Sequence, residues 1–253
     1  MKTVIHDKYI SIKSEVEDII NTFDSAGKPY GDQERNELKL FELDTTTINV
    51  KSFKVPNFIN QVAYKYFRKS KARRSYEHAV KLVEKEIGTP GPIAFAEAAH
   101  PFLFKKSYYL SEHLDYDLTF RELTENLNYP DHDNILRAFT RFTFKLHQNE
   151  VEFLDHSPGN TLIKKTADGY EFFLVDLNRM RFRTLNLEER IRNFSRLTPH
   201  ESVVMTMSDE YAKCMEADKD EVFQMMWRYT KEFQEKYWKK DRWKKRIKFW
   251  KNS

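Results

Sequence analysis

Hydrophobic and polar positions alternate over much of the first half of the chain and follow a helical period in much of the second half. Short apolar or alternating runs predict four strands, at 37–43, 48–55, 92–98 and 107–114. Between the two pairs, apolar residues recur at helical spacing from 60 to 86, and the glycines and prolines of 88–92 end that pattern. Before the first strand, 5–23 mixes β-favouring and polar residues, and 24–36 is a turn-rich polar segment.

The second half opens with a helix expected at about 118–126 and a strongly amphipathic helix over 134–148. The predicted inward stripe of the second helix consists of Ile135, Leu136, Phe139, Phe142 and Leu146. Strands separated by a loop and a polar turn are predicted between 151 and 182, and the remainder is helical. Strands that gather in the first half and helices in the second predict an α+β fold, an arrangement compatible with two lobes.

Composition excludes several protein classes. A chain of 253 residues that is 40% apolar and 15% aromatic can bury a core, which argues against disorder. Cys214 is the single cysteine, so an internal disulfide framework and multi-cysteine zinc motifs are excluded, as in proteins of a reducing compartment. The N-terminus has acids inside its apolar stretch, and no apolar run approaches membrane-spanning length. A cytoplasmic protein is predicted.

The net charge of +4 is mild, but two segments are strongly basic. Residues 51–81 hold nine Lys or Arg and one acid, Glu77, while 231–251 hold ten Lys or Arg among aromatic residues. Both clusters suit anionic partners such as phosphates, acidic sugars, lipid head groups or nucleic acid. For 223–238, a helix that packs its aromatics on the protein and an anchor on anionic lipid are equally consistent; for 239–251 the membrane anchor is favoured.

A candidate catalytic motif lies in the sequence LDHSPGN, where Asp155 and Asn160 are five residues apart. Alone, this spacing is also typical of a turn between strands. In context, an apolar helix precedes the turn, a hairpin follows it, and Asp176 ends the second hairpin strand in FFLVDLN. That order is the layout of a kinase catalytic loop and its metal-binding strand end. One carboxylate would lie near the acceptor hydroxyl, and an amide oxygen and a second carboxylate would hold Mg²⁺ against the phosphates of ATP.

The first half offers the remaining kinase elements. Lys51 lies in the predicted strand INVKSFK, where alternation can direct it toward phosphate, and Lys54 would then face the opposite way. The helix that follows carries Glu77, which would pair with Lys51 as in kinases. The alternative is that Lys51 is solvated and Glu77 pairs with Arg73 or Arg74.

Five segments together resemble the lipopolysaccharide kinase family, whose members phosphorylate Kdo or heptose in the inner core. They are FLDHSPGNTLI, FFLVDLNRM, INVKSFK, RKSKARRSYEHAVKL and IGTPGPIAF, within about 35–183. The resemblance implies a bilobal protein-kinase-like fold, with a β-rich N-lobe of residues 1–110 and a mainly helical C-lobe of 111–253. It also implies roles for five residues: catalytic Asp155, magnesium ligands Asn160 and Asp176, phosphate-binding Lys51 and its helix partner Glu77.

The chain departs from protein kinases at several points. Phe153 stands two residues before Asp155, where protein kinases usually carry histidine, and Asp176 is followed by Leu-Asn instead of Phe-Gly. No Ala-Pro-Glu sequence closes an activation segment, and the glycine loop is reduced to Gly27 and Gly31, the predicted nucleotide-binding glycines. The first three departures argue against a regulated protein kinase.

Three further positions carry narrower expectations. His147, at the end of the amphipathic helix, is typical of a structural histidine. His156, inside the catalytic turn, fits a contact to substrate or phosphate as well as a structural role. The segment 108–112 is predicted to form the hinge between the lobes, where backbone groups would meet adenine.

The predicted function is therefore transfer of phosphate from ATP, with Mg²⁺, to a Kdo or heptose hydroxyl of lipopolysaccharide core or of a lipid-linked sugar. The expected location is the inner face of the cytoplasmic membrane. Alternatives are an atypical Ser/Thr protein kinase, a small-molecule kinase, a pseudokinase or a nucleic-acid-binding module. Retention of all five site residues argues against a pseudokinase. Because no zinc, helix-turn-helix or RNP-type signature is found, nucleic acid is not expected as a partner.

Overall fold

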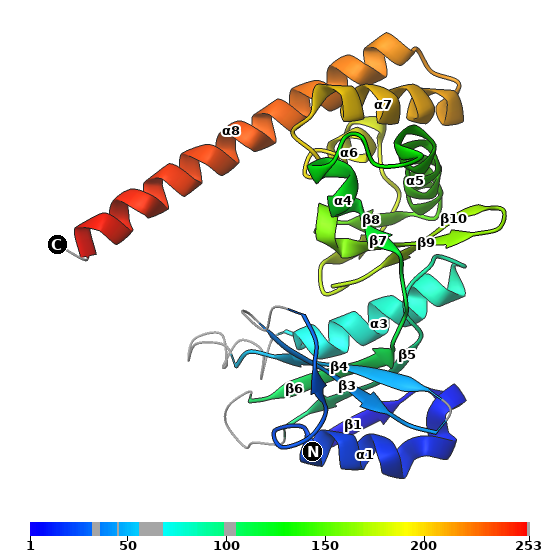
Figure 1. Cartoon of the computed structure of the whole chain (residues 1–253), viewed down its shortest axis with the longest axis vertical. Helices are drawn as coiled ribbons and strands as arrows, with labels where there is room; N and C mark the ends of the chain where they lie inside the picture. Colours follow the sequence, from blue (N-terminus) through cyan, green and yellow to red (C-terminus); the bar gives the residue numbers. More distant parts are fainter. Residues whose placement is uncertain (32–35, 45, 56–67, 99–104, 252–253) are drawn as a thin grey trace. The chain divides into compact units, whose positions relative to one another are not determined.

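The computed structural model describes residues 1–31, 36–44, 46–55, 68–98 and 105–251. The chain forms two compact units: unit 1 contains Met1–Asp115 and Phe173–Arg179, and unit 2 contains Tyr116–Phe172 and Met180–Ser253. The predicted α+β class is confirmed, with a β-rich first unit and a mainly helical second unit (Figure 1). The lobes 1–110 and 111–253 stay a prediction; the units differ from them chiefly in 173–179, which lie in unit 1.

Unit 1 is built on an antiparallel six-stranded sheet in the order β1-β5-β6-β4-β3-β2 (Figure 1). The strands are β1 (Lys2–Ile5), β2 (Lys28–Pro29), β3 (Asn36–Glu42), β4 (Thr47–Phe53), β5 (Pro92–Glu97) and β6 (Ser107–Glu112). All four predicted strands are present. Since β6 pairs with β4 on one edge and β5 on the other, its backbone is already used, and the predicted hinge at 108–112 is wrong.

Two helices cover opposite faces of this sheet. Alternation in β4 sends Ile48 and Val50 to the face covered by α1 (Lys13–Thr22), after the 3₁₀ helix η1 (Asp7–Ile12), and Phe53 to the face covered by α3 (Lys71–Glu84). The part of the expected 60–86 helix at 60–67 lies outside the described residues. Sequence analysis left α1 unassigned, although Val16, Ile19 and Ile20 bury one of its faces. The mixed composition of 5–23 concealed that short stripe.

Unit 2 surrounds the predicted amphipathic helix, now α5 (His132–Gln148), as Figure 1 shows. The other helices are α4 (Phe120–Glu125), α6 (Leu187–Arg192), α7 (Glu201–Met215) and α8 (Lys219–Lys251). The strands are β7 (Leu118–Thr119), β8 (Val151–Phe153), β9 (Thr161–Thr166), β10 (Gly169–Leu174) and β11 (Met180–Phe182), with a short 3₁₀ turn η2 (Pro158–Asn160). Four of the five predicted stripe residues of α5 are buried, and Phe142 packs against the same core in part.

The long helix α8 changes character along its length. Its first part packs on α7 and α6 and buries Val222, Met226 and Tyr229. Farther along, Trp238 is 52% exposed and Trp243 is 65% exposed. Figure 1 shows this end of α8 extending beyond the other helices of its unit. The packing interpretation therefore holds for the first part of the helix, and the exposed aromatics lie in the second part.

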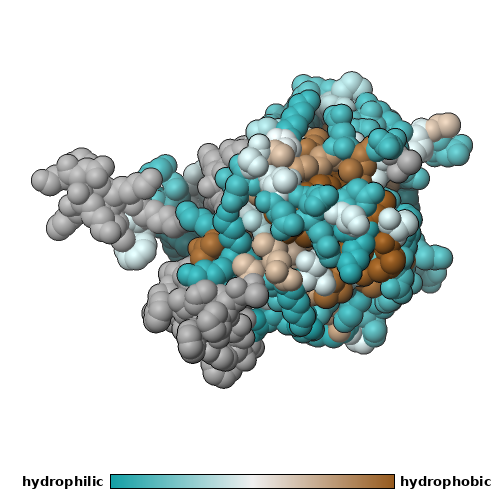
Figure 2. Space-filling model, turned by 90° about the horizontal axis from the view of Figure 1, so that it is seen from below, coloured by the Kyte–Doolittle hydropathy of each residue, from teal (hydrophilic) through white to brown (hydrophobic). Residues whose placement is uncertain are grey.

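The face of the molecule drawn in Figure 2 is largely polar. Figure 2 views the molecule from the side on which α1 lies in Figure 1, and hydrophilic residues cover most of that face, with hydrophobic residues visible between them. Among the helices within the described ranges, none combines the length and the apolar character needed to cross a bilayer.

Candidate active site

The site in unit 1 begins with Lys51 on β4. Alternation places Lys51 on the same face of the sheet as Phe53, where its ammonium lies 5.4 Å from the Phe53 ring centroid. Lys51 Nζ donates a hydrogen bond to Asp176 Oδ1 at 2.7 Å, and only 17% of the lysine side chain is exposed. Lys54 is exposed. Two residues separated by 125 positions in the sequence thus form one ion pair.

Asp176 follows β10 in a strained backbone conformation. Its φ of 58° lies in the left-handed region, which costs a non-glycine residue about 1–3 kcal/mol. Of the other non-glycine residues with positive φ in the described segments, Glu86, Glu150 and Glu216 lie at helix C-termini, where that conformation is common, and Asp131 is the N-cap of α5 (His132–Gln148). Asp176 has no such role. A left-handed carboxylate residue that ends or begins no helix is a candidate functional position.

The surroundings of Asp176 favour its ionised form. Burial alone would raise the pKa of this carboxyl, but the charge and hydrogen bond of Lys51, the amide of Asn178 at 2.8 Å and the charge of Lys71 outweigh it and lower the pKa. An ionised carboxylate offers only acceptors, as a cation ligand requires.

Hydrogen bonds from α3 and the turn after it fix the segment around Asp176. Thr89 Oγ1 donates to the Leu174 carbonyl at 2.9 Å, and His78 Nδ1 donates to the Leu177 carbonyl at 2.6 Å. Burial lowers the pKa of His78, so the ring is neutral at pH 7. Carbonyls on both sides of Asp176 are therefore held by the body of unit 1.

Glu77 has partners other than the predicted one. Its carboxylate accepts hydrogen bonds from Lys69 Nζ at 2.8 Å and Arg73 Nε at 2.8 Å. Burial opposes ionisation, but these two cations outweigh it and lower the pKa of Glu77. The structure therefore brings Glu77 to Arg73, the alternative considered above, while Lys51 meets Asp176. The Lys51–Glu77 pair stays a prediction.

The two glycines of the reduced loop have different surroundings. Gly27 has φ +83°, and a Cβ atom there would lie 2.6 Å from the Phe41 ring, so both its conformation and its packing exclude a side chain. Gly31 has φ +75°, and no atom of the described residues lies within 4 Å of a Cβ position there. Gly27 is thus explained by packing against β3, whereas only the positive φ of Gly31 favours glycine at that position. Residues 32–35 lie outside the described residues.

The site in unit 2 is the turn after β8. Asp155 lies there with 17% of its side chain exposed, and Arg196 Nη2 is 2.9 Å from its Oδ1. Asn160, at the end of η2, donates its side-chain Nδ2 to the Asp155 carbonyl at 2.8 Å. That bond uses the donor end of the amide and leaves the oxygen as the group Asn160 can offer to a cation. The two predicted residues of the LDHSPGN motif therefore lie together.

Two residues just after α6 donate side-chain hydrogen bonds to the backbone leading into this turn. Asn193 Nδ2 donates to the Phe153 carbonyl at 2.9 Å, and Arg196 Nη1 donates to the Leu154 carbonyl at 3.0 Å. Sequence analysis missed both residues, because they lie about forty positions after the motif and belong to no recognisable pattern.

Both histidines near the motif are buried. His156 has no exposed surface and contacts Phe139, Phe153 and Phe194, and among the described residues neither ring nitrogen has a partner with hydrogen-bond geometry. Burial lowers its pKa to about 3, although the nearby Asn193 opposes the fall. Its predicted contact to substrate is excluded by this burial. His147 bonds Tyr211 at 2.8 Å, as expected of a structural histidine, and burial lowers its pKa to about 4.

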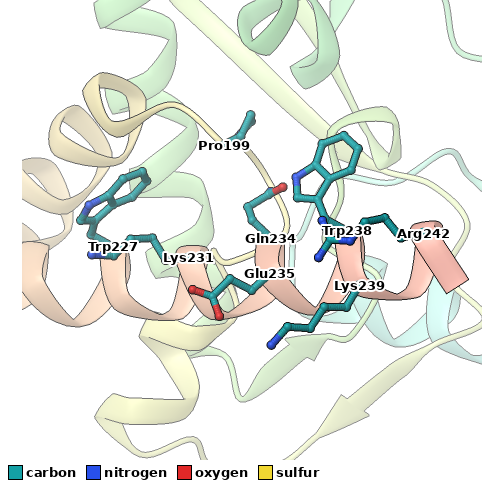
Figure 3. Close-up of a pocket in the computed structure, with 8 residues that line it drawn as sticks. All are labelled: Pro199, Trp227, Lys231, Gln234, Glu235, Trp238, Lys239 and Arg242. Carbon is teal, nitrogen blue, oxygen red and sulfur yellow. The ribbon is translucent and has the colours of Figure 1, made fainter.

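Two surface hollows lie on unit 2. A cleft of about 480 Å³ is bounded by β8, β11 and the α6 region, and its arginines are paired with acids: Arg183 with Glu152 and Glu189, and Arg192 with Glu188. A second hollow of about 410 Å³ lies between Pro199 and α8. Figure 3 shows Trp227 and Trp238 rising from the same side of α8 as Gln234.

The oxygen atoms of the predicted metal ligands suit Mg²⁺ better than they suit a metal ion coordinated only by protein side chains. Within the described ranges, no three His, Cys, Asp or Glu side chains gather as a metal-binding group. Mg²⁺ commonly uses one or two protein oxygens and completes its shell with water and substrate phosphates. The Asp176 carboxylate in unit 1 and the Asn160 amide oxygen in unit 2 are each an oxygen donor of that kind.

These features together define a protein-kinase-like phosphotransferase. They are a sheet that carries an inward-facing lysine, the helix after it, and an aspartate–asparagine turn followed by a hairpin that ends in aspartate. The chain belongs to the lipopolysaccharide kinase (Kdo/WaaP) family, whose model matches residues 55–226. The predicted family is thereby confirmed, and the chain is a kinase.

Solved structures support the fold. One described as "WaaP in complex with acyl carrier protein" superposes with a TM-score of 0.62 and 15% sequence identity, over 92% of this chain and 99% of that one. At this identity the likeness establishes the fold alone. A comparison with curated protein sequences finds no significant match.

Proposed function

We propose that this kinase transfers the γ-phosphoryl group of ATP to a hydroxyl of Kdo or heptose in the inner core of lipopolysaccharide, with Mg²⁺ as cofactor. The observation that carries the proposal is the Lys51–Asp176 contact of 2.7 Å, in which the aspartate holds a strained left-handed backbone. A lysine and a metal-binding carboxylate at these two points are what kinase chemistry requires beside the phosphates of ATP.

In unit 1, Lys51 binds the phosphates and Asp176 is a magnesium ligand. When ATP enters, the Lys51 ammonium exchanges its contact with Asp176 for one with a phosphate oxygen. Glu77 is the proposed helix partner of Lys51 in that state, and Gly27 and Gly31 belong to the loop that covers the nucleotide. Lys69 and Arg73, which bond Glu77 in this structure, compete with that pairing.

In unit 2, Asp155 orients the sugar hydroxyl and accepts its proton as the new O–P bond forms and the bond between the β- and γ-phosphates breaks. Asn160 offers its amide oxygen as the second magnesium ligand. When bound, Mg²⁺ neutralises charge on the phosphates and on the departing ADP.

The test uses purified protein, ATP and Mg²⁺ with two deacylated inner-core acceptors, one in which Kdo and one in which heptose is the terminal residue. Mass spectrometry should find one added phosphate on one of them. Asp155→Asn should reduce turnover by a factor on the order of 10³, because the acceptor hydroxyl loses its base. Failure to phosphorylate either acceptor, or wild-type turnover in the variant, would contradict the proposal.

We also propose that the exposed end of α8 attaches the enzyme to the anionic inner face of the cytoplasmic membrane, where lipid-linked acceptors are found. Support comes from the exposure of Tyr237, Trp238 and Trp243 on a helix that carries eight Lys or Arg within 239–251. Tryptophan side chains suit the head-group region, and lysine and arginine suit anionic lipid.

A further inference from the structure

Arg196 makes two contacts with the turn that carries Asp155. Nη2 lies 2.9 Å from Asp155 Oδ1, and Nη1 donates to the Leu154 carbonyl at 3.0 Å. Because one planar guanidinium makes both the ion pair and the hydrogen bond, these contacts hold the Asp155 carboxylate relative to the backbone of its own turn. A lysine, with one rotatable ammonium group, could not hold both acceptors in that geometry.

The guanidinium of Arg196 is itself held by α8. It lies 5.6 Å from the ring centroid of Phe233, and its Nε atom is buried with no hydrogen-bond partner in the part of the chain that the structure describes. Four residues earlier on both segments, Arg192 lies 4.3 Å from the ring centroid of Tyr229. The segment after α6 and the helix α8 therefore meet through two arginine–aromatic contacts in matching register, each a favourable cation–π arrangement.

Only one of these arginines reaches the motif. Arg192 forms its ion pair with Glu188 at 2.6 Å, four residues away on the same helix. Arg183, across the cleft, is paired with Glu152 and Glu189. Arg196 instead directs its charge to Asp155. Arg192 therefore matches Arg196 in residue type, segment and aromatic contact but not in contact with the predicted base.

We infer that Arg196 is a positioning residue for Asp155 and that Phe233 holds Arg196 in place, so that α8 is part of the catalytic apparatus. The inference rests on the proposed role of Asp155. A displacement of about 1 Å in a reacting group can reduce the rate on the order of 100-fold, which is why a fixed carboxylate matters for transfer. Nucleotide binding should not depend on Arg196, because the residues proposed to bind ATP and Mg²⁺, Lys51, Asp176 and Asn160, have no contact with Arg196 among the hydrogen bonds and ion pairs of the described residues.

The experiment compares full-length Arg196→Ala and Arg192→Ala in the inner-core phosphorylation assay. Arg196→Ala should reduce kcat on the order of 100-fold, with the Kd of Mg·ATP within about twofold of wild type. Guanidinium ion at non-denaturing concentration should restore part of the Arg196→Ala activity and none of the Asp155→Asn activity. Arg192→Ala should stay within about threefold of wild type, a change too small to reflect displacement of Asp155.

Two further variants sharpen the test. Arg196→Lys retains the charge without the fork, and should remain impaired at least about tenfold while the Tm stays near wild type. Phe233→Leu preserves apolar volume without the aromatic face, and should reduce kcat several-fold with nucleotide binding unchanged. If Arg196→Ala does not fold, Arg196→Lys decides the question. The double variant Asp155→Asn/Arg196→Ala should be no slower than Asp155→Asn alone, because the two residues act as one unit.

The outcomes separate the inference from the proposed function. If Asp155→Asn is inactive but a folded Arg196→Ala or Arg196→Lys enzyme has wild-type kcat, the positioning role is wrong and the proposed function stands. If Arg192→Ala loses as much activity as Arg196→Ala and guanidinium restores neither, Arg196 is only structural, and the inference is again overturned. Wild-type turnover in Asp155→Asn would instead overturn the proposed function.

Discussion

The two units each hold one candidate catalytic carboxylate against a cation, but the two pairs differ in kind. Asp176 of unit 1 meets the single ammonium of Lys51 at 2.7 Å and has a strained backbone. Asp155 of unit 2 meets a guanidinium that also binds the neighbouring carbonyl and rests on an aromatic ring. A flexible lysine can change partner when phosphate binds, whereas an arginine that contacts both the carboxylate and a neighbouring carbonyl is suited to keep its position beside Asp155. The first pair is thus arranged to open and the second to persist.

The affinity for Mg·ATP in Asp176→Ala should show the largest difference between the roles of the two carboxylates. Removing a magnesium ligand should weaken Mg·ATP binding on the order of 100-fold, because the cation loses a charged oxygen and the phosphates lose its bridge. Asp155→Asn, in contrast, should leave that affinity within about twofold while turnover is lost. Calorimetric titration of both variants with Mg·ATP makes the comparison. Unchanged binding in Asp176→Ala would move the metal site elsewhere.

A double-mutant cycle on Lys51 and Glu77 should show the next largest effect. If nucleotide binding transfers Lys51 to Glu77, each single alanine variant should reduce kcat/KM for ATP by about 10–100-fold, and the double variant should lose little more. Lys54→Ala, which changes an exposed lysine just after β4, is the control and should be mild. Additive losses would show that Glu77 serves only Lys69 and Arg73.

His156→Phe tests how the burial of His156 in the LDHSPGN turn changes the free energy of unfolding with pH. The pKa of His156 is about 3 in the folded protein and about 6.5 when unfolded. Between these values the unfolded chain binds more protons, so the free energy of unfolding should fall as pH falls, by up to about 1.4 kcal/mol per pH unit. His156→Phe should remove that part of the dependence. His147 should retain its own, between about pH 6.5 and 4.

Urea unfolding at pH 7 and pH 5 measures this difference. The free energy of unfolding of the variant should exceed that of wild type by about 2 kcal/mol more at pH 5 than at pH 7. At pH 7 it should already be more stable than wild type, since two unpartnered buried nitrogens are removed. An identical pH slope in both proteins would mean that His156 is hydrated or hydrogen-bonded in solution.

Removing residues 239–253 should have the smallest effect on chemistry. The deleted part carries exposed Trp243 and eight basic residues, each worth about 1 kcal/mol near an anionic surface, so sedimentation with anionic vesicles should be lost. Turnover of a soluble acceptor should change less than about threefold, since Phe233 and the buried part of α8 remain. Charge-neutral vesicles are the control. Unfolding of the truncated protein would show instead that this end of α8 packs on the molecule.

The sequence by itself determined the features that depend on local periodicity. Alternation in β4 placed Lys51 on the face opposite to Ile48 and Val50, and the apolar stripe of 134–148 became the buried side of α5. The short spacing of Asp155 and Asn160 fixed their meeting in one turn, because five residues of chain bring the amide to the aspartate carbonyl. These features need no information from distant parts of the chain.

Only the tertiary structure decided which charges meet. Asp176 forms an ion pair with Lys51, 125 residues away, and Glu77 pairs with Lys69 and Arg73. Asp155 pairs with Arg196, which no sequence motif indicated. It also decided that His156 is buried although it lies in a polar turn. The reason is physical: periodicity determines which face a side chain occupies, but the partner on that face comes from whichever segment packs there, and the chain has many lysines and arginines of equal local character.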